Sequence, residues 1–103
     1  MTLNDIRELL VSVDPDIRHY HTTSKEDAYS YWPETQRLPV MADDEHEEAW
    51  RFYVHRFTRS EDDEIAARLF EALDACEGTT VRYLVDYDLD SDYIHHIYEC
   101  EGY

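Results

Sequence analysis

The segment from Glu48 to Cys76 changes its hydrophobic period halfway along, and this change constrains the fold more than any other feature. Up to Phe57, the pattern repeats every two residues, as in a strand whose side chains point alternately to opposite faces of a sheet. From Ile65 onward, apolar residues recur at helical spacing, which predicts a helix with one apolar stripe. The sequence therefore predicts a strand that enters a helix through a short polar turn, and the rest of the chain must cover this unit.

The periodicity also predicts a core. One face of the predicted strand carries Trp50, Phe52, Val54 and Arg56, and the other carries Arg51, Tyr53, His55 and Phe57. Ser60 is the predicted N-cap of the helix, with Asp63 three residues later as a carboxylate variant of the capping box. We expect one core from this strand, this helix and a later strand, formed by Trp50, Phe52, Val54, Ile65, Leu69, Leu73, Val81, Tyr83 and Val85.

The segments before the central unit read as one helix and two strands. Thr2 to Ser12 is predicted as a helix capped by Thr2 and Asp5, and Asp14-Pro15 ends it because the residue before proline disfavours helix. Alternation and aromatic content predict strands at Ile17 to Thr22 and Ala28 to Glu34. Gln36 to Met41 fits either a loop or a short strand, and Ala42 to Glu47 is an acidic loop.

The segment after the central unit predicts a hairpin. Glu77-Gly78 stops the helix, and strands follow at Thr79 to Leu89 and at Tyr93 to Glu101, around a turn at Asp90-Ser91. The chain of 103 residues is therefore predicted as a single α+β domain. Its antiparallel or mixed sheet would have about four to five strands, packed by two helices in the order α-β-β-β-α-β-β.

The charge of the chain is strongly negative, with nine Lys and Arg against 25 Asp and Glu and a net charge of −16. Such a surface repels nucleic-acid phosphate, so we expect no specific nucleic-acid binding. Three interpretations remain open: a solvated acidic surface, a lining that must not stick to DNA, and a mimic of DNA that inhibits a nucleic-acid-binding protein.

No motif predicts an enzyme, a metal site or a cofactor. Asp86, Asp88, Asp90 and Asp92 resemble the start of a calcium loop. Counted from Asp88, however, the loop has Tyr93 at the position that requires glycine, and counted from Asp86 it has Ile97 where a bidentate glutamate is needed. His95 and His96 are adjacent in a predicted strand, so their side chains point to opposite faces and do not suit one zinc ion. Two cysteines without a secretory segment indicate reduced intracellular thiols, and no apolar run is long enough to cross a membrane.

Nearly the whole chain resembles small phage and prophage proteins of the tail completion, or tail terminator, type. The resemblance is carried by the order of Tyr29 to Glu34, Ala42 to Glu48, Phe57 to Leu73 and Asp92 to Glu101. It implies an α+β fold, no catalytic residue and, in the relatives, a hexameric ring at the top of the tail tube that joins the head connector. The implied partners are other copies, the tail tube protein and the head connector protein. The implied location is the host cytoplasm during assembly and then the virion, or the cytoplasm of a bacterium that carries a prophage.

Physical reasoning identifies candidate contact residues for the ring that the resemblance implies. A ring around a DNA channel should repel DNA, and apolar contacts must offset the repulsion between acidic copies. The candidates are the aromatic residues Tyr29, Tyr31 and Trp32, of which the last two fit the core equally well. The acidic candidates for the channel or the ring joints are Asp43, Asp44, Glu45, Glu47 and Glu48.

Overall fold

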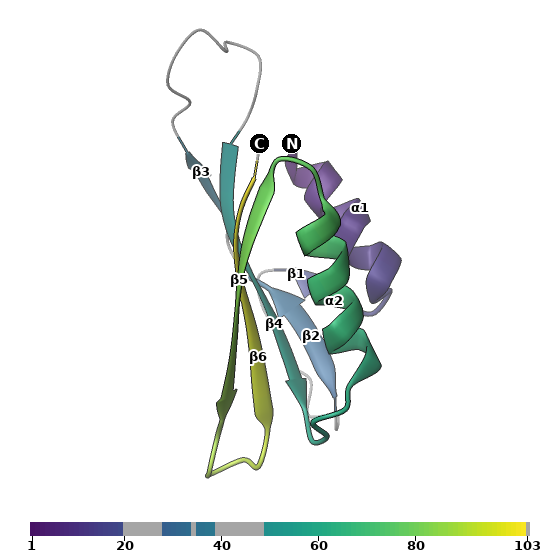
Figure 1. Cartoon of the computed structure of the whole chain (residues 1–103), viewed down its shortest axis with the longest axis vertical. Helices are drawn as coiled ribbons and strands as arrows, with labels where there is room; N and C mark the ends of the chain where they lie inside the picture. The colour runs from purple at the N-terminus through teal and green to yellow at the C-terminus, as the bar shows by residue number, and fades with distance from the viewer. Residues whose placement is uncertain (20–27, 34, 39–48, 103) are drawn as a thin grey trace, which may run out of the picture.

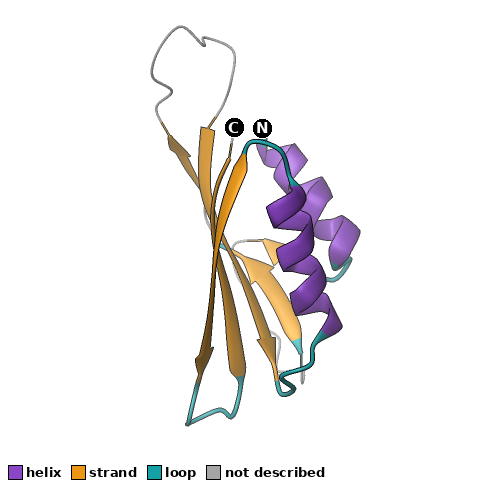
Figure 2. Cartoon of the chain, viewed as in Figure 1, coloured by secondary structure: helices purple, strands orange, loops and turns teal. Residues whose placement is uncertain are grey.

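The computed structural model describes residues 1–19, 28–33, 35–38 and 49–102 (Figures 1 and 2). Its helices are α1 (Leu3–Val13) and α2 (Glu64–Ala75). Its strands are β1 (Arg18–His19), β2 (Tyr29–Trp32), β3 (Gln36–Leu38), β4 (Ala49–Thr58), β5 (Thr79–Tyr87) and β6 (Ile94–Gly102). None of the helices in these ranges is both long and apolar enough to cross a membrane.

The strands form one mixed sheet of six strands, in the order β1-β2-β4-β6-β5, with β3 also paired to β4. Of the strand pairs in the described ranges, only β1–β2 is parallel. The long strand β4 lies at the centre, pairing with β6 from Trp50↔Gly102 to Thr58↔Ile94 and with β2 on its other side. β5 is the outermost strand on the β6 side.

Both helices lie on one face of the sheet, as Figure 1 shows, and the other face has no helix over it among the described residues. The core fills the space between the helices and the sheet. Its fully buried members come from both helices and from β2, β4 and β6: Ile6, Leu10, Trp32, Phe52, Val54, Leu69, Leu73, Tyr98 and Cys100. Tyr98 also donates a hydrogen bond from its hydroxyl to the carbonyl of Ala66, at 2.7 Å, which ties β6 to α2.

Local signals explain where the helices begin and end. The amide of Asp5 donates to Thr2 Oγ1 and the amide of Thr2 donates to Asp5 Oδ2, so the predicted capping box of α1 is confirmed. The predicted N-cap of α2 was wrong, because Asp63 rather than Ser60 accepts from the amide of Ala66. Ser60 instead takes part in a local turn, where its side chain accepts from the amide of Asp62. At the far end, Gly78 has φ 82°, a conformation that glycine adopts without strain.

The predicted core was right for its helix and its central strand and wrong for the end of β5. Phe52, Val54, Leu69 and Leu73 are fully buried, and Trp50, Ile65 and Val81 pack against them. Tyr83 and Val85, however, are 38% and 56% exposed. α2 and β5 start from one tight connection and then diverge, as Figure 1 shows, so the helix covers only the first part of the strand.

The predicted α+β class is confirmed, with two differences in the strands. Residues 36–38 form β3, so the order is α-β-β-β-β-α-β-β. The predicted strand at 17–22 is represented by the two residues of β1, and residues 20–22 lie outside the described ranges. The acidic loop predicted at 42–47 lies outside them as well.

Candidate interaction surface on the open face of the sheet

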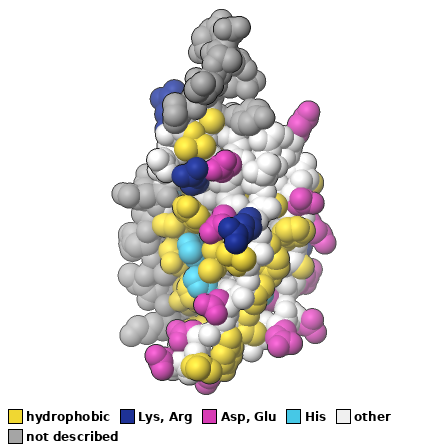
Figure 3. All heavy atoms as spheres, turned by 60° about the vertical axis from the view of Figure 1, so that its left-hand side comes forward, with side chains coloured by type: hydrophobic (Ala, Val, Ile, Leu, Met, Phe, Trp, Pro, Cys, Tyr) yellow, Lys and Arg dark blue, Asp and Glu magenta, His cyan; other side chains and the backbone are white. Residues whose placement is uncertain are grey.

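The face of the sheet opposite the helices carries a cluster of aromatic, imidazole and aliphatic side chains. Strand alternation places these residues there, and the registers align them in rows across the strands. One row runs Tyr29, Phe57, His95 and Asp86, and the next runs Tyr31, His55, Ile97 and Leu84. We call the apolar and imidazole members the open-face patch: Tyr29, Tyr31, His55, Phe57, Leu84, His95 and Ile97. Figure 3 shows apolar and histidine side chains gathered on this side of the molecule.

The rings of the open-face patch stack on one another. Phe57 is at the centre, with ring centroids 4.1 Å from His95 and 4.9 Å from Tyr29. Tyr31 stacks on His55 at 4.9 Å, and Tyr93 meets Phe57 edge-on at 5.9 Å. Aromatic pairs in such geometries are worth about 0.5–1.5 kcal/mol beyond the area they bury. Mutual stacking therefore half-buries these side chains, although no helix or strand of the described residues covers them.

The two histidines of the patch are hydrogen-bonded, with His55 Nδ1 and His95 Nε2 only 2.7 Å apart. Burial, and after it the neighbouring His95, lowers the pKa of His55 to about 4. Burial also lowers the pKa of His95, although Asp86 and Asp88 oppose the shift. At neutral pH both imidazoles are therefore uncharged, one donating and the other accepting, and the centre of the open face is electrically neutral.

Charged side chains border the patch at both ends of the strands. Beyond Tyr53, Arg51 bonds Glu101 through Nη2 at 2.7 Å, and Arg82 lies 3.6 Å from Glu99. At the other end, the turn between β5 and β6 and the end of β5 expose four carboxylates, those of Asp86, Asp88, Asp90 and Asp92. The open face thus has a neutral aromatic centre and a charged border, which is the composition of many protein–protein interfaces.

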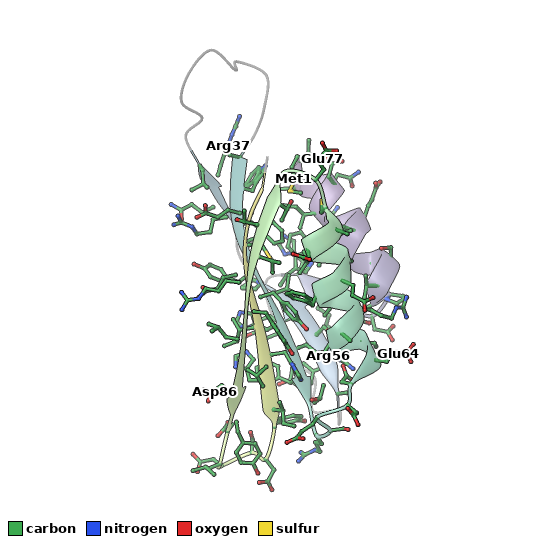
Figure 4. The ribbon with its side chains drawn as sticks, in the orientation of Figure 1. Met1, Arg37, Arg56, Glu64, Glu77 and Asp86 are labelled. Atoms are coloured by element: carbon green, nitrogen blue, oxygen red, sulfur yellow. The ribbon has the colours of Figure 1, made fainter. Side chains whose placement is uncertain are left out.

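A second cluster of polar residues lies on the covered face. Arg56 is buried between the sheet and α2 (Figure 4). Its guanidinium donates to both carboxylate oxygens of Asp63, at 2.9 and 3.1 Å, and to Ser30 Oγ at 3.2 Å, and it lies 3.7 Å from Asp14. Burial raises the pKa of Asp63, but the bonds from Arg56 and from the amide of Ala66 outweigh it and lower the pKa overall.

This buried network has a structural role. Its arginine is held by two carboxylates and a hydroxyl, so it is not available to bind an anion. Next to it, His96 contacts Thr58 Oγ1 at 3.2 Å and the Tyr83 hydroxyl at 2.6 Å, which occupies both ring nitrogens. Among the described residues, no group of three or more His, Cys, Asp and Glu side chains is arranged to hold a metal ion.

The structure separates the contact residues predicted from the sequence. Tyr29 and Tyr31 belong to the open-face patch. Trp32 is 1% exposed and lies in the core on the opposite face, where it stacks on His19 with 3.5 Å between the centroids, so it offers no surface to a partner. The acidic candidates Asp43, Asp44, Glu45, Glu47 and Glu48 lie outside the described residues.

The sequence reasoning missed His55, Phe57 and His95 as contact candidates. The alternation in β4 had already placed His55 and Phe57 on one face, and the separation of His95 from His96 onto opposite faces was predicted correctly. What the sequence did not contain was the register between β4 and β6, which brings His55 and His95 together.

The fold is similar to that of a chain in a solved structure. No protein-family model and no curated protein matches the chain. A chain from the structure "Virion of native gene transfer agent (GTA) particle" is similar in fold, with a TM-score of 0.54 and 11% sequence identity. The likeness covers 90% of this chain and 81% of that one, so it spans most of the domain rather than a shared hairpin.

Proposed function

We propose that this protein is a structural component of a phage-like virion, of the head–tail joining or tail completion type, and that it assembles as a ring at the end of the tail tube. The observation that carries the proposal is the open-face patch. An antiparallel sheet commonly has one face on the core and one polar face in water. Here the second face is aromatic at its centre, which suits contact with another protein better than contact with water.

The comparison with solved structures supports the virion context. The similar chain comes from a gene transfer agent particle, and the likeness in fold covers 90% of this chain. The proposed partners follow from that context and are other copies of this chain, the tail tube protein and the head connector protein. The protein would assemble in the host cytoplasm and remain in the virion.

The charge of the chain fits a component that surrounds a DNA channel. A net charge of −16 per copy repels phosphate, so a genome would slide past a ring of such copies without binding. The same charge makes the copies repel one another, and this repulsion acts over about 8 Å at physiological ionic strength. Apolar contact through the open-face patch would offset it, since burial of aromatic surface persists when salt is added.

The alternative, a DNA mimic, fits the open face less well. A mimic must present carboxylates where its target expects phosphates, whereas the centre of this face is aromatic and its histidines are neutral. The proposed role requires no reaction, and the titratable groups of the patch are better explained as parts of a contact surface.

The test is assembly of the purified protein across a salt series, followed by light scattering and negative-stain electron microscopy. We expect rings of more than two copies to form as salt rises. The double variant Tyr31→Ser with Phe57→Ser should weaken ring formation by more than about tenfold, because it removes two stacked rings from the contact.

Leu89→Ser is the matched control, since Leu89 is also apolar and is exposed on the β5–β6 turn, away from the patch. It should leave ring formation unchanged. Circular dichroism would check that all variants are folded. The proposal is wrong if the wild-type protein forms no species above a dimer at any salt concentration, or if the double variant forms rings as readily as the wild type.

A further inference from the structure

β5 is an edge strand with exposed apolar side chains on both of its faces. It ends the strand order of the sheet, and no described strand pairs with its outer edge. Among the described residues, most of the large exposed apolar side chains belong to β5 and the turn that follows it, namely Tyr83, Leu84, Val85, Tyr87 and Leu89. A long edge strand of this kind is a template for pairing with another strand.

The hydrogen bonding of β5 shows which of its residues face outward. The amide of Asp88 donates to the carbonyl of Tyr93, just beyond the β5–β6 pair. In an antiparallel pair, alternate residues direct both backbone groups toward the same neighbour. Even-numbered residues of β5 therefore bond β6, and the odd-numbered residues Val81, Tyr83 and Val85 direct their backbone groups to the free edge. The outward amide of Tyr87 bonds the Asp86 side chain.

We propose that this free edge pairs with the β5 strand of a second copy, antiparallel about a two-fold axis at Leu84. In this register the outward groups of Tyr83 bond those of Val85 of the second copy, and those of Val81 bond those of Tyr87. On the open face, each Arg82 lies opposite an Asp86, and the two Leu84 side chains meet on the axis. Opposite charges placed directly across a strand pair are favourable, and like charges are not.

Charge complementarity selects this register. Shifting the axis to Tyr83 puts Arg82 opposite Leu84, and shifting it to Val85 puts Leu84 opposite Asp86. The axis at Val85 does bring Arg82 opposite Asp88, but this residue lies beyond the end of β5. Only the axis at Leu84 pairs Arg82 with an acid inside the strand and also joins apolar residues to apolar residues. Arg82 has the freedom to make this contact, because its side chain is 73% exposed although it lies near Glu99. Asp86 lies on the open side at the lower end of β5 in Figure 4, and would turn from the Tyr87 amide to Arg82.

The self-complementary sequence is the reason to assign a second copy rather than an extended segment of another protein. The two-fold axis would stand perpendicular to the sheet, so the helices of both copies would lie on one side and the two open-face patches would become continuous through Leu84. The pair would also cover Tyr83, Val85 and Tyr87 on the helix side, where they are now 38%, 56% and 51% exposed.

This pair goes beyond the proposed function. A two-fold pair is closed, whereas a ring larger than two requires head-to-tail contacts. We assign the pair to the free protein, where it removes an edge that would otherwise invite aggregation, and it leaves the open-face patch uncovered for the proposed assembly. The Tyr31→Ser, Phe57→Ser variant should therefore still form the pair even though it loses the ring.

The test is disulfide trapping of the full chain in a Cys76→Ser background, in which the buried Cys100 is the remaining native thiol. Leu84→Cys places two thiols on the axis, with Cα atoms about 4.5 Å apart in a pair that lacks backbone bonds, and this distance permits a disulfide. Thr80→Cys is the matched control on the same face of the same strand. Its two copies would lie about 25 Å apart in the proposed register, since each strand residue advances about 3.3 Å.

With oxidised glutathione, Leu84→Cys should give mostly covalent dimer and Thr80→Cys mostly monomer. Equal trapping of both, or of neither, overturns the register. Charge variants provide a second measurement by analytical ultracentrifugation. Arg82→Glu or Asp86→Arg alone should weaken the dimer by about tenfold, and the double exchange should restore it. The proposed dimer is wrong if the wild-type protein sediments as a monomer at every concentration. It is also wrong if the β5 edge binds an extended peptide but not a second copy of the chain.

Discussion

The two faces of β4 carry side chains of similar size, but the helices lie over one face and not over the other. On the covered face, Phe52 and Val54 are fully buried beneath the helices, together with Tyr98 and Cys100 of β6. On the open face, His55 and Phe57 remain half-buried because neighbouring rings shield them. The same alternation thus produces a core on one side and a surface that retains free aromatic area on the other.

The polar groups on the two faces differ in the same way. On the covered face, Arg56 is surrounded by acceptors, and removing it would leave the carboxylates of Asp14 and Asp63 without their cation. On the open face, the Arg51–Glu101 pair has side chains that are 41% and 51% exposed, so water can replace either member. The difference indicates that the covered face contributes most to the stability of the fold, whereas the open face is the surface that we propose for contact with other proteins.

Two arginines of β4 provide the sharpest test of this comparison, and the largest expected effect. Arg56→Met keeps most of the side-chain volume but leaves the buried Asp14 and the partly buried Asp63 without their cation. We expect a loss of about 3–5 kcal/mol in the free energy of unfolding, as for other buried ion pairs that lose one member. Arg51→Met, the matched change on the open face, should cost less than about 1 kcal/mol. Urea denaturation of both variants would measure the difference, and equal losses would contradict the comparison.

An aliphatic pair tests the same contrast without charge. Leu69 of α2 is fully buried, so Leu69→Ala should lower the free energy of unfolding by about 2–5 kcal/mol. Ile97 lies half-buried in the open-face patch, and Ile97→Ala should cost only about 1 kcal/mol because much of its surface already meets water. If Leu69→Ala costs less than about 0.5 kcal/mol in denaturant melts, α2 does not bury the face assigned to it.

Much of the covered face could be predicted from the sequence, because it depends on local periodicity. The stripe of α2 and the inward residues of β4 follow from spacing alone. The position of the N-cap could not be predicted in this way, since Asp63 is selected by its bonds to Arg56 of β4 as well as by its bond to the first turn of α2. The exposure of Tyr83 and Val85 could not be predicted either, because it depends on the angle at which α2 diverges from β5.

The open-face patch could be predicted only in part. Tyr29 and Tyr31 were identified from their aromatic character, but the same reasoning also selected Trp32, which alternation places on the other face. Assigning each residue to a face requires knowing which side of the short strand β2 meets the helices. The contact of His55 with His95 depends on a register between residues forty positions apart in the chain, which no local pattern encodes.

The histidine pair makes the open face sensitive to acid. The expected effect on the free energy of unfolding is the smallest of the three. The pKa of His55 in the folded protein is about 4, below its ordinary value of 6.5. Between these values the unfolded chain binds a proton that the folded chain does not, so stability falls as the pH drops from about 6.5 toward 4. The contribution is about 1–2 kcal/mol once the partial exposure of the ring is allowed for.

His55→Gln isolates this contribution, because glutamine retains a polar partner for His95 and does not titrate. The free energy of unfolding of the wild type should decline more steeply than that of the variant between pH 6.5 and 4, while His95, His96 and the carboxylates contribute to both curves. Among the described residues, the titratable groups that face His55 are His95 on β6 and Tyr31 on β2, so no described carboxylate compensates for a protonated His55. Denaturant melts across this pH range would measure the difference, and an NMR titration of the His55 ring would locate its pKa. Parallel curves for the two proteins would show that the imidazole is solvated in the folded state, and that the centre of the open face is wetter than its stacked rings indicate.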